Sequence, residues 1–104
     1  MTALVDTDLL HDQFDGLRPD VLAQIRVAFA ADMMRESAAL VAATAARDPD
    51  AASRARHALD GLCGHFGAGL VMDLARGPLH DTAGRNAFEM AVARTVAAVD
   101  AALQ

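Results

Sequence analysis

Apolar side chains in this sequence recur at steps of three and four residues, the spacing that puts them on one face of an α-helix. From Pro19 to about Ala46, one such face consists of Leu22, Ile25, Phe29, Met33, Leu40 and Ala43. Near the end of the chain, a second stripe consists of Phe88, Val92, Thr95, Val99 and Leu103. No segment alternates apolar and polar residues as a half-buried strand does. Much of the 54% hydrophobic content is Ala, the best helix former. The pattern predicts an all-α fold.

Prolines, glycines and acidic residues divide the chain into the expected helices. These cover Thr7–Phe14, Pro19 to about Ala46, Pro49–Phe66, a short stretch through Leu70, Val71 and Leu74, and roughly Thr82–Leu103. Thr7 or Asp8 is expected to cap the first helix, and Asp48 the third. The run Gly67-Ala68-Gly69 permits a bend, and Gly77-Pro78 stops the helix that follows it.

The connections between these helices are short, which favours packing between sequence neighbours. We therefore expect one domain over residues 1–104, an antiparallel up-and-down four-helix bundle with the short N-terminal helix as a cap. A monomer is the expected state.

The charge of the chain excludes several classes of partner. Its net charge is −5, and its nine cationic residues are all Arg, mostly scattered singly. An acidic chain without a basic stripe is a poor ligand for nucleic acid or an anionic membrane. Protein partners are therefore predicted.

No signal peptide and no apolar run of roughly 20 residues is present, so a cytoplasmic location is expected.

The chemistry of the sequence is concentrated around His57. On a helical wheel of about 100° per residue, Leu59 and Phe66 lie opposite His57, among Ala52, Ala55, Leu62 and Cys63. The side chains within about 60° of His57 are Ser53, Arg54, Asp60, Gly61 and Gly64. The wheel predicts that His57 points to solvent, and that the apolar set forms the core.

Gly61 and Gly64 are unexpected in a helix, because each costs about 1 kcal/mol relative to Ala. Their alignment with His57 indicates that another molecule comes close to the imidazole. Two simpler interpretations compete with this one. His57 could be an ordinary surface histidine, and the glycines could allow a neighbouring helix to pack closely.

The run from His57 to Ala68 resembles the signature of histidine-containing phosphotransfer (HPt) domains. In that family an apolar residue follows the histidine by two positions, Gly by four, and Gly-Ala by ten and eleven. The sequence matches at Leu59, Gly61 and Gly67-Ala68, and the small Cys63 is acceptable. It departs at Asp60, where Lys is usual, and at Leu62, where a small residue is common.

The resemblance implies a phosphoryl carrier of two-component signalling rather than an enzyme. His57 would exchange a phosphoryl group with a receiver-domain aspartate or a hybrid histidine kinase, and the carrier itself would need no cofactor. Ser53, Arg54, Asp60, Gly61 and Gly64 would lie near the phosphate or the docked partner. The negative charge of Asp60 would repel the phosphate, and Arg54 on the other flank is the expected compensation.

Two further functions remain open at this stage. The domain could be a degenerate adaptor that binds or sequesters a receiver without transfer. Alternatively, the strip of His57, Gly61 and Gly64 could be a contact of a helical oligomerisation module.

A metal site is disfavoured. His65 lies about 80° around the wheel from His57, and His11 with Asp8 and Asp15 is more typical of a solvated face.

Overall fold

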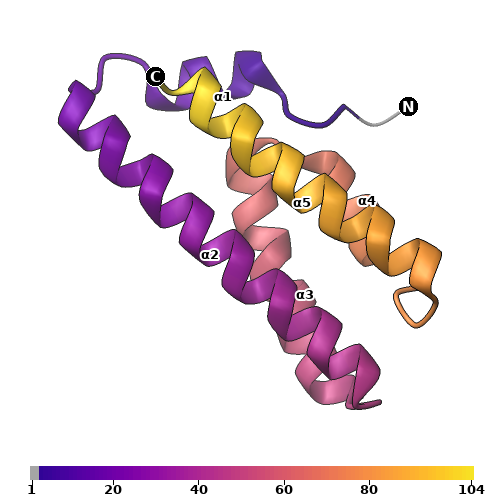
Figure 1. Cartoon of the computed structure of the whole chain (residues 1–104). Helices are drawn as coiled ribbons and strands as arrows, with labels where there is room; N and C mark the ends of the chain where they lie inside the picture. Colours follow the sequence, from indigo (N-terminus) through magenta and orange to yellow (C-terminus); the bar gives the residue numbers. More distant parts are fainter. Residues whose placement is uncertain (1–2) are drawn as a thin grey trace.

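The computed structural model describes residues 3–104, which form five α-helices and no strand (Figure 1). The helices are α1 (Thr7–Phe14), α2 (Pro19–Ala45), α3 (Pro49–Phe66), α4 (Gly69–Ala75) and α5 (Thr82–Ala102). The all-α class is therefore confirmed. The ends of α2 and α5 each come one residue before the expected position. Among the described residues, no helix is long and apolar enough to cross a membrane.

The start of α1 corrects the expected cap. Asp6, rather than Thr7 or Asp8, is the N-cap, and its carboxylate accepts a hydrogen bond of 3.1 Å from the Leu9 N–H. The backbone N–H of Asp6 donates to the Gly67 carbonyl at 2.9 Å. This contact with the end of α3 holds Asp6 in place just before the first helical turn. Asp6, Thr7 and Asp8 are all suitable N-cap residues by type, and the contact with Gly67 favours Asp6 among them.

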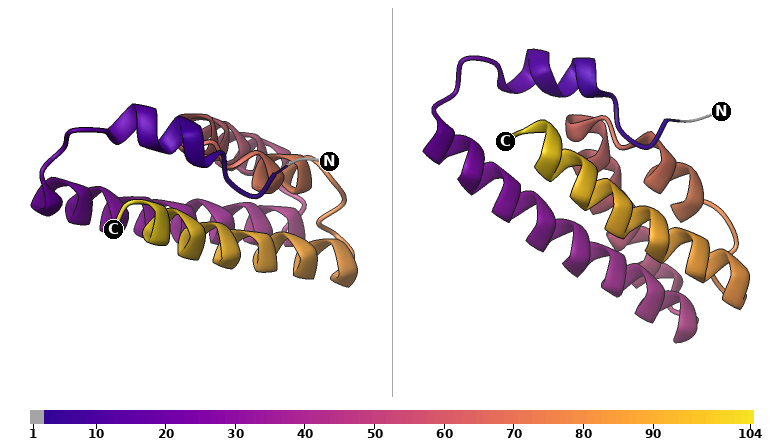
Figure 2. Two further views of the ribbon diagram at one scale, coloured as in Figure 1. Left: turned by 90° about the horizontal axis from the view of Figure 1, so that it is seen from above. Right: turned by 45° about the horizontal axis from the view of Figure 1, so that its top comes forward.

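The helices lie in two layers. Figures 1 and 2 show α2 and α5 side by side, with α3 and α4 on the other side of the molecule. Helix α2 packs against both α3 and α5, and α4 packs against α3 and α5. Helix α1 contacts α5, near the C-terminal end of the chain in Figure 2. Each of the long helices therefore has one face toward a shared interior.

The core fixes the orientation of α3. Leu59 of α3 is fully buried, as are Met33 of α2 and Phe88 of α5. The Phe66 ring lies 4.2 Å from the Phe29 ring and 5.2 Å from the Phe14 ring, measured between centroids. These aromatic contacts join α3 to α1 and α2. Because one face of α3 is committed to the core in this way, the opposite face must point outward.

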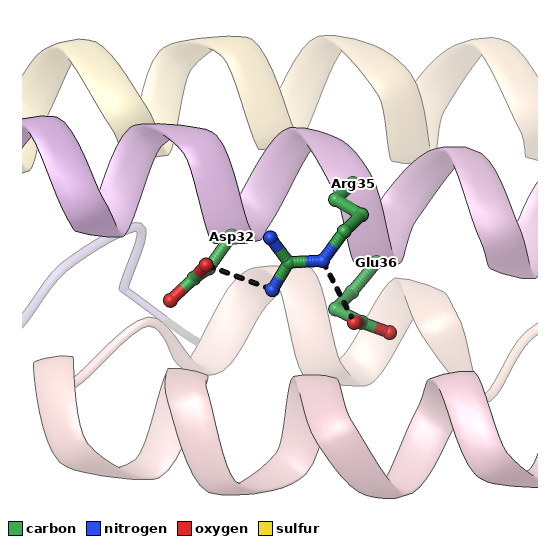
Figure 3. A network of polar contacts seen from close by, with 3 residues as sticks. All are labelled: Asp32, Arg35 and Glu36. Carbon is green, nitrogen blue, oxygen red and sulfur yellow. Dashed lines mark hydrogen bonds and ion pairs between the residues drawn. The ribbon is translucent and has the colours of Figure 1, made fainter.

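The outer surface of α2 carries a small ionic network (Figure 3). The Arg35 guanidinium donates to Asp32 at 2.8 Å and to Glu36 at 3.4 Å. These two hydrogen bonds raise the pKa of Arg35 above its ordinary value, and the bond to Asp32 has the larger effect. Exposed pairs of this kind add little to the stability of a fold, because water and salt screen their charges. The network therefore lies on the surface of α2 and contributes little to the position of the helix.

Candidate functional site

Helix α3 is capped at both ends, which fixes where the helix begins and ends around its central residues. Asp48 caps it as expected, and its carboxylate accepts a hydrogen bond of 3.0 Å from the Ala51 N–H. Pro49 occupies the first turn. At the other end Gly67 adopts a left-handed conformation with φ of +67°. A Cβ there would lie 2.9 Å from the Asp6 Cβ, so both the backbone angle and the space require glycine.

His57 lies in the middle of α3 with its side chain exposed to solvent, as the wheel predicts. Leu59 and Phe66 are buried on the opposite face. Leu62 is a correction, since it is only partly buried. Its wheel position is about 60° from that of Leu59, at the edge of the apolar stripe. The residue packs against the core without being enclosed in it.

The strip around His57 is open. Its five other expected members are all exposed: Ser53, Arg54, Asp60, Gly61 and Gly64. A Cβ built on Gly61 or on Gly64 would meet nothing within 4 Å outside its own helical turn. Close packing of α3 against another described element therefore does not explain these glycines. They leave a bare surface along the helix next to the imidazole.

A shallow hollow of about 340 Å³ continues this bare surface. It lies between α3, the start of α4 and the segment before α1, and is lined by Ala3, Asp6, Asp60, Cys63, Gly64, Gly67, Gly69 and Met72. Three of these residues are glycines, so backbone forms much of the wall. The hollow thus begins at Asp60 and Gly64 of the strip and extends away from His57, toward the start of α4.

Asp60 has a partner that sequence analysis did not anticipate. Its Oδ1 atom lies 3.2 Å from Nη2 of Arg76, the residue that follows α4. Both side chains are more than half exposed, at 54% for Asp60 and 61% for Arg76. The cation beside the carboxylate is therefore Arg76, and the role expected of Arg54 beside the phosphate stays a prediction. The pairing depends on the bend at Gly67 that returns α4 along α3.

A second contact holds the same end of α4 against α3. The Nε–H of Arg56 donates to the Ala75 carbonyl at 2.9 Å. Arg56 directly precedes His57 in the sequence, and Asp60 follows it by three residues. The end of α4 is thus fixed to α3 on both sides of the histidine position. This two-point attachment determines where Arg76 lies.

The other histidine of α3, His65, makes contacts with α1 and with the neighbouring Phe66. The His65 Nδ1 lies 3.1 Å from the Gln13 amide nitrogen, and its ring meets Phe14 and Phe66 edge-on. These contacts tie α3 to α1. Within residues 3–104, no three His, Cys, Asp or Glu side chains are grouped closely enough to hold a metal ion.

Cys63 lies beneath the exposed strip as a free, buried thiol. Burial raises its pKa to about 11, and the charge of Asp60 adds to the shift. At neutral pH the thiol is therefore protonated, which makes it a poor nucleophile. Next to Gly61 and Gly64, the nitrogen nucleophile that α3 exposes is therefore the imidazole of His57, while the Cys63 thiol is withdrawn into the core.

Arg76 is the residue of this region that the sequence did not single out. It stands before Gly77-Pro78, which reads as an ordinary helix end. The one available signal was indirect, because an unexplained Asp60 calls for a nearby cation.

Comparison of the chain with family models, curated proteins and solved structures finds no significant match.

Proposed function

We propose that this protein is a phosphorelay carrier similar to HPt domains, with His57 as the residue that accepts and donates the phosphoryl group. One observation carries the proposal. His57 is exposed in the middle of a helix, and the helix surface next to it is bare at Gly61 and Gly64 for no internal packing reason. Such a surface suits a partner that must bring a phosphorylated aspartate to the imidazole.

The chemistry of the exchange is within reach of this site. The lone pair of the unprotonated ring nitrogen forms the N–P bond, while the P–O bond to the partner's aspartate breaks. The aspartate carboxylate leaves with the electron pair, and the other ring nitrogen keeps its proton. Phosphoryl transfer of this kind depends mainly on in-line positioning and charge neutralisation. A carrier therefore needs a reachable nucleophile on a rigid helix.

The proposal extends to architecture and setting. We infer an antiparallel up-and-down four-helix bundle with α1 as its cap, because the link between α2 and α3 is only residues 46–48 and α2 packs on both α3 and α5. The partners would be a response-regulator receiver domain, a hybrid histidine kinase, or both. The protein would act as a monomer in the cytoplasm, where such receivers are found.

The test uses the purified protein and a panel of phosphorylated receiver domains. We expect the phosphoryl group to appear on this chain, in a linkage that is labile in acid and stable in base. Binding of a receiver without any transfer would identify the chain as an adaptor and refute the carrier function. Self-association through the bare strip, measured by sedimentation, would instead favour an oligomerisation module.

A further inference from the structure

The C-terminal end of α4 carries a cation beside the exposed face of α3. Asp60 stands one helical turn after His57, a spacing that places the two Cβ atoms about 5–6 Å apart. The Arg76 guanidinium lies 3.2 Å from the Asp60 carboxylate. A phosphoryl group on His57 would extend outward from the same face on which Asp60 holds this guanidinium. We propose that Arg76, positioned by Asp60, is the cation that stabilises phosphorylated His57; this inference rests on the proposed function.

The geometry favours Arg76 over the two other arginines near His57. The Arg56 guanidinium is partly buried and engaged with the Ala75 carbonyl. Arg54 lies on the opposite flank of His57 from Asp60, exposed to solvent. Arg76 has its backbone N–H bonded to the Met72 carbonyl, and its side chain is accessible. It is thus the arginine whose position is defined and whose charge remains available.

The chemistry of guanidinium explains how one residue can serve two anions. Arg presents five N–H donors in a planar fork, and its ion pair with Asp60 uses the Nη2 atom. The fork can bind a phosphate while keeping its carboxylate, in the charge-assisted geometry that favours Arg at phosphate sites. The carboxylate then has two effects. It orients the cation, and its own repulsion of the phosphate is largely cancelled by the pairing.

The test measures how much of the protein carries phosphate at equilibrium with a small donor, phosphoramidate, and a fixed concentration of ammonia. Arg76→Gln should lower the equilibrium constant for phosphorylation by roughly 5–10-fold at low ionic strength. The effect should shrink as salt is added, because the charges are exposed. Arg76→Lys should recover most of the loss. Arg94→Gln on α5, which removes one charge elsewhere, should match the wild type.

The role of Asp60 is tested by a double-mutant cycle. In the Arg76→Gln protein an unpaired carboxylate faces the phosphate, so adding Asp60→Asn should raise the phosphorylation constant by about 5-fold. In the wild-type background Asp60→Asn should have a much smaller effect, because it removes the repulsion and the positioning of Arg76 together. Equal effects in the two backgrounds would show that the two residues act independently.

The outcomes separate this inference from the proposed function. If wild-type protein is phosphorylated on His57 and Arg76→Gln is phosphorylated equally at low salt, Arg76 is not the stabilising cation and the carrier function stands. The same conclusion follows if Arg54→Gln produces the loss instead. If the wild type takes no phosphate from phosphoramidate or from any receiver, the carrier function itself is wrong. Circular dichroism melts confirm that each variant compared is folded.

Discussion

The Cys63 thiol lies one turn of α3 beyond the Asp60 carboxylate, buried beneath the surface on which Asp60 is exposed. Only 2% of Cys63 is accessible to solvent. Burial, and then the charge of Asp60, raise the pKa of the thiol from 9.0 to about 11. Folding therefore opposes ionisation of this side chain, which has a measurable consequence.

The free energy of unfolding should fall as pH rises from 9 to 11. In that range the unfolded chain loses the Cys63 proton while the folded chain keeps it, so stability decreases by up to about 1.4 kcal/mol per pH unit. The chain has no Lys and no Tyr, so Cys63 is the only side chain expected to titrate there. Urea denaturation at several pH values measures the slope. Cys63→Ala should abolish it, and a flat wild-type profile would contradict the assigned shift.

Thr95 of α5 should be replaceable by Val with a gain in stability. The residue is fully buried, and its hydroxyl has no hydrogen-bond partner in the described structure. A buried polar group without a partner costs about 1–3 kcal/mol, and Val has nearly the same shape. Thr95→Val should therefore raise the midpoint of urea denaturation. Thr44→Val is the contrasting variant and should not raise the midpoint, because the Thr44 hydroxyl donates to the Leu40 carbonyl at 2.9 Å. A loss of stability in Thr95→Val would show that its hydroxyl is satisfied in solution.

Gly61→Leu should separate folding from docking. A side chain at this position meets open space, and Leu favours helix over Gly by up to about 1 kcal/mol, so the melting temperature should not decrease. The added side chain would stand between His57 and an approaching receiver. Transfer from a phosphorylated receiver should therefore slow by at least about tenfold. Ala97→Leu, at an exposed position of α5, is the control for added bulk. Unchanged transfer in Gly61→Leu would mean that partners do not approach over the glycine.

The sequence predicts the helices of this protein well, because their signals are local. Apolar spacing, Asp48-Pro49 and Gly67 each act within a few residues, and the wheel correctly exposes His57 opposite Leu59. The errors arise where tertiary contacts decide.

One error and one omission illustrate the limit. The cap of α1 is Asp6, whose backbone is held by Gly67, sixty-one residues further along the chain. The partner of Asp60 is Arg76, which reaches it only because α4 folds back on α3. Residue spacing along one helix cannot report such contacts. The sequence therefore predicted the exposed charge of Asp60 but not the cation that pairs with it.

Mapping the phosphorylated residue tests the central claim most directly. Wild-type protein, His57→Gln and the control His65→Gln are incubated with a phosphorylated receiver domain, and the acid-labile label on each is measured. Gln keeps much of the size and polarity of the imidazole but supplies no nucleophilic nitrogen, so His57→Gln should carry no label while remaining helical and binding the receiver. His65→Gln should be labelled like the wild type. Label retained on His57→Gln would contradict the assignment of His57 as the phosphoryl acceptor.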